Sequence, residues 1–266
     1  MTEARIDVKI ETRDGIGEIA SVTIENRSRR NCVGTPEVVA LRRAFRELSE
    51  RERLRAVVLT GAGDRAFIGG ADLNELGGLC ADSGRLYITR LHLACKAIRE
   101  CPVPVIARIN GFCLGAGLEI AASCDMRVAS ETAVLGMPEV HMGLPSVIEA
   151  ALLPGLIGWG KTREILITGE TFPAREAYAM GLVEKVVSPD ALDGHVAHWL
   201  ALIGRGSPAA IRSQKALINR WQQVSVEEGI QAGINALSEA YETGEPQAAI
   251  KAFFEDKARR KAAAKG

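Results

Sequence analysis

The sequence has no surplus of either charge. Its 266 residues include 33 Lys and Arg and 33 Asp and Glu, so the formal net charge at pH 7 is +0. Proteins that bind nucleic acid or anionic membranes usually carry an excess of Lys and Arg, because these side chains neutralise phosphates. The charge balance therefore argues against nucleic acid and membrane as partners of this chain.

Long apolar runs and regularly spaced cysteines are also absent. The most apolar stretch, 147–160, is interrupted by Glu149 and Pro154 and is too short to span a bilayer. Residues 1–15 carry a charge every few positions, unlike a signal peptide or a transit sequence. The six cysteines form no CxxC pair, which favours reduced thiols over a disulfide framework. We therefore expect a cytoplasmic protein.

The sequence does contain enough hydrophobic residues, 47%, for a substantial core. Short apolar runs alternate with amphipathic segments, which predicts an α/β fold. Strands are predicted at 16–24, 56–60, 105–110, 126–130 and 182–187. Helices are predicted from Thr35 to the charged stretch at 51–55, at 82–99, after Gly117, at 174–180, and almost throughout from Pro189 onward. We divide the chain into a core, 1–200, and a helical C-terminal region, 201–266.

Three glycine-bearing segments stand out as candidates for a ligand site. They read FIGGADL at 67–73, LGAGLE at 114–119 and LGMPE at 135–139, and the last two end in Glu119 and Glu139. A missing side chain lets a ligand oxygen approach backbone N–H groups, and a helix start directs several such groups the same way. Carboxylates beside those donors can move protons. Together the three segments suggest acyl thioester chemistry.

Glu119 has two interpretations when it is considered alone. An acid in the first turn of a helix is common because it complements the helix dipole. However, Glu119 lies between Leu118 and Ile120, an apolar setting that favours a buried, functional carboxyl. The same segment also partly matches a dinucleotide-binding fingerprint. That match is poor, because Ile120 stands where a small residue should allow close packing and Glu139 follows Pro138 instead of a second strand.

With these residues in view, the chain resembles the enoyl-CoA hydratase/isomerase, or crotonase, superfamily. Its three signature stretches look like 67–73, 109–130 and 135–144 of this sequence, in the same order and spacing. Weaker similarity at 29–33, 168–187, 207–219 and 243–257 extends the resemblance over nearly the whole chain. The resemblance implies a crotonase-like ββα superhelix, with a C-terminal region that assembles the chain into homotrimers or homohexamers.

The resemblance also implies a function in fatty acid metabolism and a role for each site residue. An acyl-CoA thioester would be the substrate, with no separate cofactor and no metal. The backbone N–H groups of Ala71 and Ala116 would polarise the thioester carbonyl, Glu119 would deprotonate water and Glu139 would protonate the α-carbon. Substrate and coenzyme A would contact further residues of the motifs, namely Arg29, Gly69, Gly70, Asp72, Leu73, Gly115, Gly117, Pro138 and Gly143.

Because isomerases of this family often keep only one of the two acids, the presence of both favours an enoyl-CoA hydratase. The alternatives are an enoyl-CoA Δ-isomerase, another acyl-CoA lyase of this family, or a non-catalytic RNA-binding or scaffold protein. The sequence departs from many hydratases after Glu139, where a glycine-rich stretch is replaced by VHMGLPSVIEAALLPGLIG at 140–158. An unusual acyl pocket near Leu144 and Ile148 is therefore expected.

The histidines give weaker evidence for a metal site or a catalytic role. His195 and His198 are one helical turn apart, but no third ligand is evident, so we expect no metal site there. His141 follows Glu139 closely and could either orient active-site groups or lie at the surface.

Overall fold

The computed structural model describes residues 5–263, and the chain divides into two units that meet between Arg205 and Gly206. The predicted boundary, 200/201, falls inside helix α7 (Leu192–Arg205), which continues to the end of the first unit.

A six-stranded sheet forms the centre of the first unit. Its order is β1-β2-β3-β5-β7-β10, and all neighbours are parallel except the hairpin pair β1 and β2. The strands are β1 (Arg5–Arg13), β2 (Gly17–Glu25), β3 (Leu54–Gly61), β5 (Val105–Ile109), β7 (Met126–Ser130) and β10 (Lys185–Val187). The parallel strands β3, β5 and β7 are buried on both faces, which explains their nearly continuous apolar runs.

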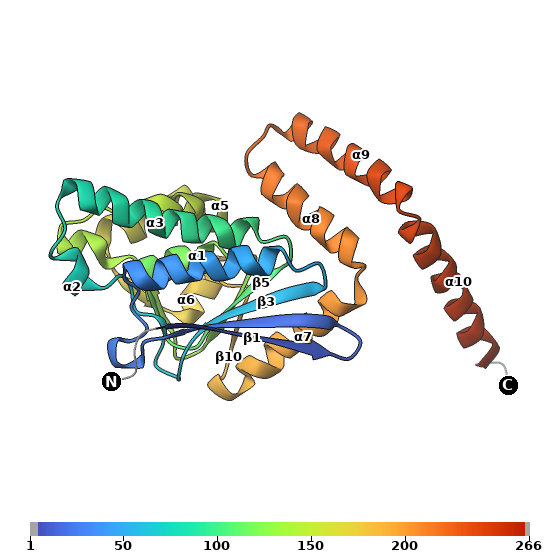
Figure 1. Ribbon diagram of the computed structural model, residues 1–266, viewed down its shortest axis with the longest axis horizontal. Helices are drawn as coiled ribbons and strands as arrows, with labels where there is room; N and C mark the ends of the chain where they lie inside the picture. The colour runs from blue at the N-terminus through green and yellow to red at the C-terminus, as the bar shows by residue number, and fades with distance from the viewer. Residues whose placement is uncertain (1–4, 264–266) are drawn as a thin grey trace. The chain divides into compact units, whose positions relative to one another are not determined.

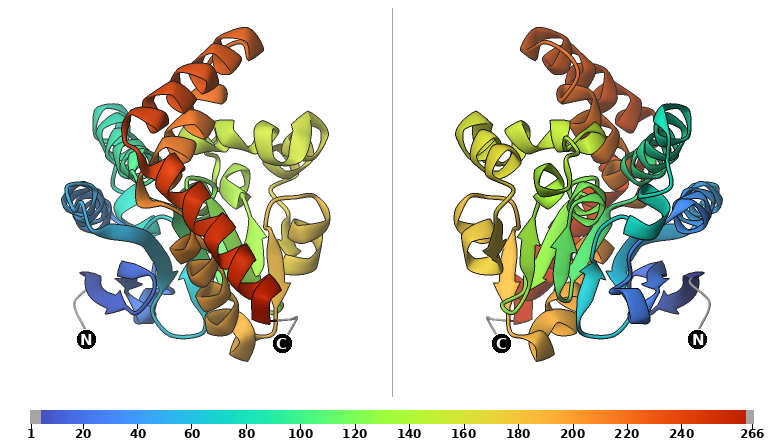
Figure 2. Two further views of the ribbon diagram at one scale, coloured as in Figure 1. Left: turned by 90° about the vertical axis from the view of Figure 1, so that its right-hand side faces the viewer. Right: turned by 90° about the vertical axis from the view of Figure 1, so that its left-hand side faces the viewer.

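Helices cover both faces of this sheet (Figures 1 and 2). Helices α1 (Thr35–Ser49) and α3 (Ala81–Glu100) lie side by side on one face and bury Leu41, Phe45 and Leu91 there. Helix α7 covers the other face with Val196 and Leu200. The side chains of successive strand residues point to opposite faces of the sheet, as expected from the two-residue period of a strand.

A second, four-stranded sheet was not predicted. Its order is β4-β6-β8-β9, formed by β4 (Ala66–Ile68), β6 (Phe112–Leu114), β8 (Val134–Gly136) and β9 (Thr171–Pro173); only β9 is antiparallel to its neighbour. Each of the long strands β3, β5 and β7 is followed by one of these short strands and then by a helix. The fold is thus the expected spiral of ββα units.

The remaining helices of the first unit connect these layers. They are η1 (Arg27–Arg29), α2 (Leu73–Leu76), α4 (Ala116–Ala122), η2 (Pro138–Met142), η3 (Ile148–Leu152), α5 (Leu153–Thr168), α6 (Ala174–Ala179) and η4 (Pro189–Ala191). The second unit consists of α8 (Pro208–Trp221), α9 (Val226–Glu242) and α10 (Glu245–Ala263). Ser207 and Ser225 cap the first two of these with their side chains, and Gly244 adopts φ +75° between the last two.

The predicted strands and helices of the first unit are present, but helix α5 (Leu153–Thr168) was not predicted. Two further differences concern strands. The strand predicted at 182–187 is reduced to β10, and the edge strand β1 was missed because most of its residues are charged and exposed. Within residues 5–263, no helix is long and apolar enough to cross a membrane.

Candidate active site

Three glycine-bearing segments leave the same edge of the short sheet. Strands β4, β6 and β8 are parallel neighbours, with Ile68 paired to Cys113 and Leu114 paired to Gly136. The carboxyl ends of parallel strands meet at one edge, where open sheets bind their ligands. Residues 69–72, the start of α4 and the start of η2 follow these three ends directly. The short sheet therefore brings the three motifs together.

Two close approaches show how tightly the segments fit. Gly115 has φ 51° and ψ −120°, and a Cβ there would lie 2.5 Å from Glu139 Oε1. A Cβ on Gly117 would lie 2.3 Å from the carbonyl oxygen of Ile68. Glycine is needed at both positions because side chains would overlap neighbouring atoms. The Glu139 carboxyl consequently lies against the backbone where α4 begins.

Two backbone amides near this point lack an acceptor. Among residues 5–263, neither the N–H of Ala71 nor that of Ala116 has a hydrogen-bond partner. Their neighbours are bonded: Asp72 N–H donates to Val33 at 2.9 Å, and Gly115 N–H donates to Gly136 at 2.9 Å. Ala116 is the first residue of α4, where the helix dipole is positive. Unpaired amides of this kind can receive a ligand oxygen.

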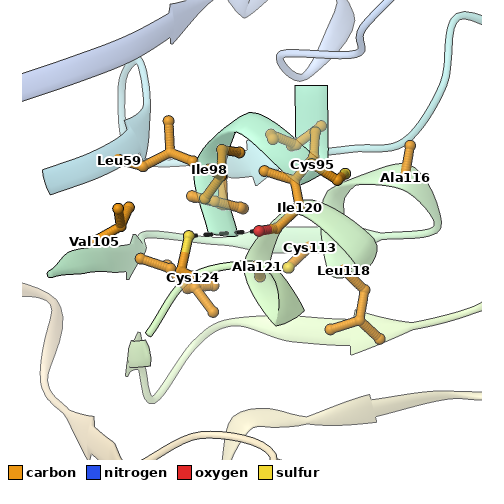
Figure 3. Close-up of a cluster of buried hydrophobic side chains, with 14 of the residues drawn as sticks. Leu59, Cys95, Ile98, Val105, Cys113, Ala116, Leu118, Ile120, Ala121 and Cys124 are labelled. Atoms are coloured by element: carbon orange, nitrogen blue, oxygen red, sulfur yellow. Dashed lines mark hydrogen bonds between the residues drawn. The ribbon is translucent and has the colours of Figure 1, made fainter. Parts of the chain in front are cut away.

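Glu119 is buried among apolar side chains. It lies in the first turn of α4 with 4% of its surface exposed. Figure 3 shows the buried apolar cluster to which Leu118 and Ile120 of the same helix belong. Its Oε1 accepts a hydrogen bond from Ala150 N–H at 3.2 Å. Burial raises the pKa of Glu119 to about 9, and the negative charges of Glu139 and Glu149 add to the effect against the opposing Ala150 bond. Glu119 is therefore protonated in this site at neutral pH.

Glu139 is held by a hydroxyl group. It follows Pro138 in η2, which ends at Gly143 with φ 74°. Ser146 Oγ donates a hydrogen bond to Glu139 Oε2 at 2.9 Å. Ser146 and Ala150, which bind the two carboxyl groups, both belong to the segment in which the sequence departs from many hydratases. Sequence reasoning did not identify either residue as a partner of the acids.

Three of the predicted substrate and coenzyme A residues, Gly69, Gly70 and Asp72, lie in the loop before α2, whereas Arg29 ends η1 and Leu73 begins α2. Arg29 forms an ion pair with Asp72 at 2.5 Å, yet its side chain remains 55% exposed. Burial tends to raise the pKa of Asp72, but hydrogen bonds from Asn74 and the charge of Arg29 lower it overall below its usual value. Gly69 N–H donates to the Arg30 carbonyl at 2.8 Å, and Leu73 is exposed. The pair Arg29 and Asp72 thus joins two predicted residues.

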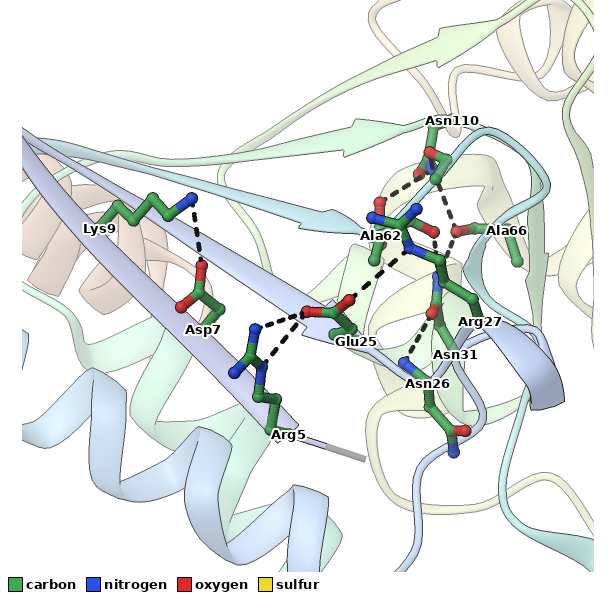
Figure 4. Close-up of polar contacts among 12 residues, drawn as sticks. Arg5, Asp7, Lys9, Glu25, Asn26, Arg27, Asn31, Ala62, Ala66 and Asn110 are labelled. Atoms are coloured by element: carbon green, nitrogen blue, oxygen red, sulfur yellow. Dashed lines mark hydrogen bonds and ion pairs between the residues drawn. The ribbon is translucent and has the colours of Figure 1, made fainter. Parts of the chain in front are cut away.

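Asparagines that the sequence analysis did not single out shape the glycine loop at 61–66 (Figure 4). Asn31 Nδ2 donates to the carbonyls of Ala62 and Ala66, at 3.0 and 2.8 Å. Asn110 Nδ2 approaches the carbonyls of Gly61, Gly63 and Ala66 at 2.7–3.1 Å. This loop leads into β4 and has no regular secondary structure of its own. The buried side-chain amides satisfy its backbone carbonyls in place of such structure, and so hold the loop in position.

The three histidines considered in the sequence analysis, His141, His195 and His198, take no part in these contacts. His141 Nε2 bonds to the carbonyl of Thr168 at 2.8 Å on an exposed face. His195 packs edge-on against Trp199, and its ring centroid is 6.0 Å from that of His198.

Comparisons with known proteins agree with this architecture. Residues 14–262 match the model of the enoyl-CoA hydratase/isomerase family. The chain is 32% identical over 240 residues to the short-chain-enoyl-CoA hydratase of Clostridium acetobutylicum, which covers 90% of this chain and 92% of that one. It is 31% identical to the peroxisomal Delta(3,5)-Delta(2,4)-dienoyl-CoA isomerase of Arabidopsis thaliana, over 78% and 79% of the two chains. The crystal structure of enoyl-CoA hydratase from Bacillus anthracis superposes with a TM-score of 0.89 at 30% identity, covering 94% and 96%.

Proposed function

The chain belongs to the enoyl-CoA hydratase/isomerase family of enzymes, and we propose that it is a hydro-lyase that adds water to a 2-enoyl-CoA thioester to give a 3-hydroxyacyl-CoA. The observation that supports this most directly is the meeting of two unpaired amides and two carboxyl groups at one edge of the short sheet. Hydration needs both kinds of group.

The two amides would donate hydrogen bonds to the thioester oxygen. When water adds to the double bond, negative charge moves onto this oxygen and an enolate forms. The N–H groups of Ala71 and Ala116 are fixed by the backbone, so they can bind the enolate more strongly than the neutral carbonyl. This differential binding lowers the barrier to the reaction.

The two carboxyl groups would move the protons that accompany addition to the two carbons of the double bond. We assign Glu119 as the base that takes a proton from water and Glu139 as the acid that protonates the α-carbon. Such groups each contribute on the order of a hundred- to ten-thousandfold in rate. Because the pKa of Glu119 is about 9, hydration uses its ionised form, and the reverse dehydration uses the protonated form that dominates at neutral pH. Ionisation of Glu119 should therefore contribute a rise in the rate of hydration with pH, for as long as Glu139 carries the proton that it donates.

The remaining assignments concern binding and assembly. We place the thioester end of coenzyme A along Gly69, Gly70 and the start of α4, with Arg29 near the nucleotide. The second unit exposes large apolar side chains on α9 and α10, including Val226, Leu237 and Phe253. Their exposure supports assembly into a trimer or a dimer of trimers, in which they would be covered.

An isomerase is the second candidate, and the protonation of Glu119 favours it. Moving a double bond requires one base that carries a proton between two carbons. A neutral Glu119 would leave Glu139 to act alone in that way. The two activities differ in rate: an isomerase would convert a 3-enoyl thioester to the 2-enoyl form faster than it adds water.

The experiment follows the absorbance of the conjugated thioester of crotonyl-CoA. We expect the purified protein to remove this absorbance, and E119Q and E139Q each to abolish the loss. E100Q, which changes an exposed acid at the end of α3, should behave as wild type. No hydration by wild type, or undiminished rates in both site variants, would exclude a hydratase mechanism through these acids.

A further inference from the structure

Another buried carboxyl group interacts with Glu119. Glu149 is in η3 with 3% of its surface exposed, and its negative charge acts on both Glu119 in α4 and Cys95 in α3. The next residue, Ala150, donates the hydrogen bond that Glu119 accepts. Glu149 is thus one residue away from the only hydrogen bond made by the Glu119 carboxyl within residues 5–263.

Two side chains of α3 hold Glu149. Its Oε1 is 2.9 Å from His92 Nδ1 and 3.2 Å from a terminal nitrogen of Arg99. His92 and Arg99 are two helical turns apart on the same face of α3, with the buried Cys95 between them. An ion pair at this depth fixes the position of both partners, because removing either one leaves a buried charge.

The other oxygen of Glu149 has no such partner. Oε2 is buried and accepts no hydrogen bond from residues 5–263. A buried acceptor without a donor is unfavourable and rare in folded proteins. The backbone just before Glu149 is unfavourable as well, since Ile148 is β-branched and has φ 42°. Neither feature is needed to fill the core, which suggests that the position of Glu149 serves the neighbouring site.

We propose that Glu149, anchored by His92 and Arg99, is a positioning residue for Glu119. The anchor holds η3 against α4, so that Ala150 N–H keeps its hydrogen bond to Glu119 Oε1. The other oxygen of the Glu119 carboxyl then stays directed at the reacting atoms. The charge of Glu149 also favours the protonated form of Glu119. The inference rests on the proposed role of Glu119 in hydration and extends it.

Two neighbouring acids raise the pKa of Glu119 through their charge. Tyr87 and Cys95 of α3 also interact with Glu119, but burial raises the pKa of each well above neutrality, so both are uncharged there. Glu139 of η2 raises the pKa of Glu119 through its negative charge, and Glu149 of η3 does the same. Of these two acids, Glu149 is the one that contacts Arg99 and His92. Changing Glu149 or Arg99 should therefore move the titration of Glu119 in opposite directions.

The test is a pair of variants with opposite charge changes. E149Q keeps an acceptor for His92 and Arg99 but removes a negative charge, whereas R99Q removes a positive one. The Glu119 carboxyl is titrated by ¹³C NMR of protein labelled at glutamate, and its signal is assigned by its loss in E119Q. We expect the Glu119 titration to move to lower pH in E149Q, by on the order of one pH unit, and to higher pH in R99Q. E100Q is the matched control and should leave it unchanged.

Kinetics supply the second readout. In E149Q we expect the part of the pH profile that reports Glu119 ionisation to move to lower pH with the NMR titration. At a pH where Glu119 is ionised in both proteins, we expect kcat for crotonyl-CoA hydration to fall about tenfold with KM nearly unchanged, because the carboxyl is less well positioned. An unchanged Glu119 titration in both variants would overturn the inference even if wild type hydrates crotonyl-CoA. If wild type does not hydrate it, the proposed function fails, and the NMR titrations still decide whether Glu149 controls Glu119. If E149Q does not fold, the R99Q titration alone decides, and a Glu119 titration that does not move to higher pH in R99Q would overturn the inference.

Discussion

Replacing Glu119 by Gln should make the protein more stable while removing its activity. The buried Glu119 carboxyl remains protonated up to about pH 9, whereas in the unfolded chain it ionises near its ordinary pKa of 4.5. Its contribution to stability is fully present below pH 4.5 and is lost as the pH rises toward 9, because the unfolded state releases a proton that the folded state keeps. Gln cannot ionise and avoids this loss.

The size of the effect follows from the pH interval. Each pH unit above 4.5 lowers the free energy of unfolding of the wild-type protein by about 1.4 kcal/mol, which gives a loss of roughly 3 kcal/mol at pH 7. Gln retains an oxygen for the hydrogen bond from Ala150 N–H, so little of the folded structure should change. In a domain of this size, 3 kcal/mol corresponds to roughly 5–10 °C in Tm.

The assay is urea unfolding at 25 °C, from pH 4 to pH 8.5. The E119Q protein should gain stability over wild type progressively with pH, and the two should be nearly equal at pH 4. E100Q should differ from wild type by less than about 0.5 kcal/mol throughout. A stability difference that is the same at pH 4 and pH 8, or an E119Q protein that is the less stable at pH 8, would refute the burial argument.

Three further substitutions test the geometry around the acids. S146A removes the hydroxyl that binds Glu139 and should lower kcat about tenfold, measured by the crotonyl-CoA assay; an unchanged kcat would show that this bond does not orient the acid. G115A should be less stable than wild type, because alanine is strained at φ 51°, and its folded form should lose activity more than about a hundredfold, because the methyl group displaces the Glu139 carboxyl. G84A, which meets open space in α3, should keep full activity, and equal losses per folded molecule in both variants would contradict this. N110A should destabilise the protein by about 2–3 kcal/mol in urea unfolding, since it frees three loop carbonyls; wild-type stability would rule out the proposed scaffold role.

Elements with long periodic patterns could be predicted from the sequence. Thr35 and Pro36 with apolar residues at helical spacing predicted α1, and the apolar run at 56–60 predicted β3. The strands of the short sheet could not be predicted in this way, because three residues contain too little periodicity and β6 is confined between glycines. Their pairing depends on contacts between segments that are distant in the chain.

The motifs revealed the candidate acids but not the groups that control them. Glu119 was predicted to be buried from its apolar neighbours, and with 4% of its surface exposed this part of the prediction is confirmed. Ser146 and Ala150 bind the acids from a segment whose sequence differs from the familiar pattern, so no motif pointed to them. Glu149 did leave a signal, namely a lone acid within the most apolar stretch of the chain.

The central claim is that the N–H of Ala116 binds the thioester oxygen, and A116P tests it most directly. Proline lacks this N–H but suits the first position of a helix, so α4 should form, while A116G keeps the N–H and serves as the control. Both variants are compared in crotonyl-CoA hydration, with unfolding measured in parallel. We predict that kcat/KM falls about a hundred- to a thousandfold in A116P and stays near wild type in A116G. A folded A116P protein that hydrates crotonyl-CoA as fast as A116G would contradict the account.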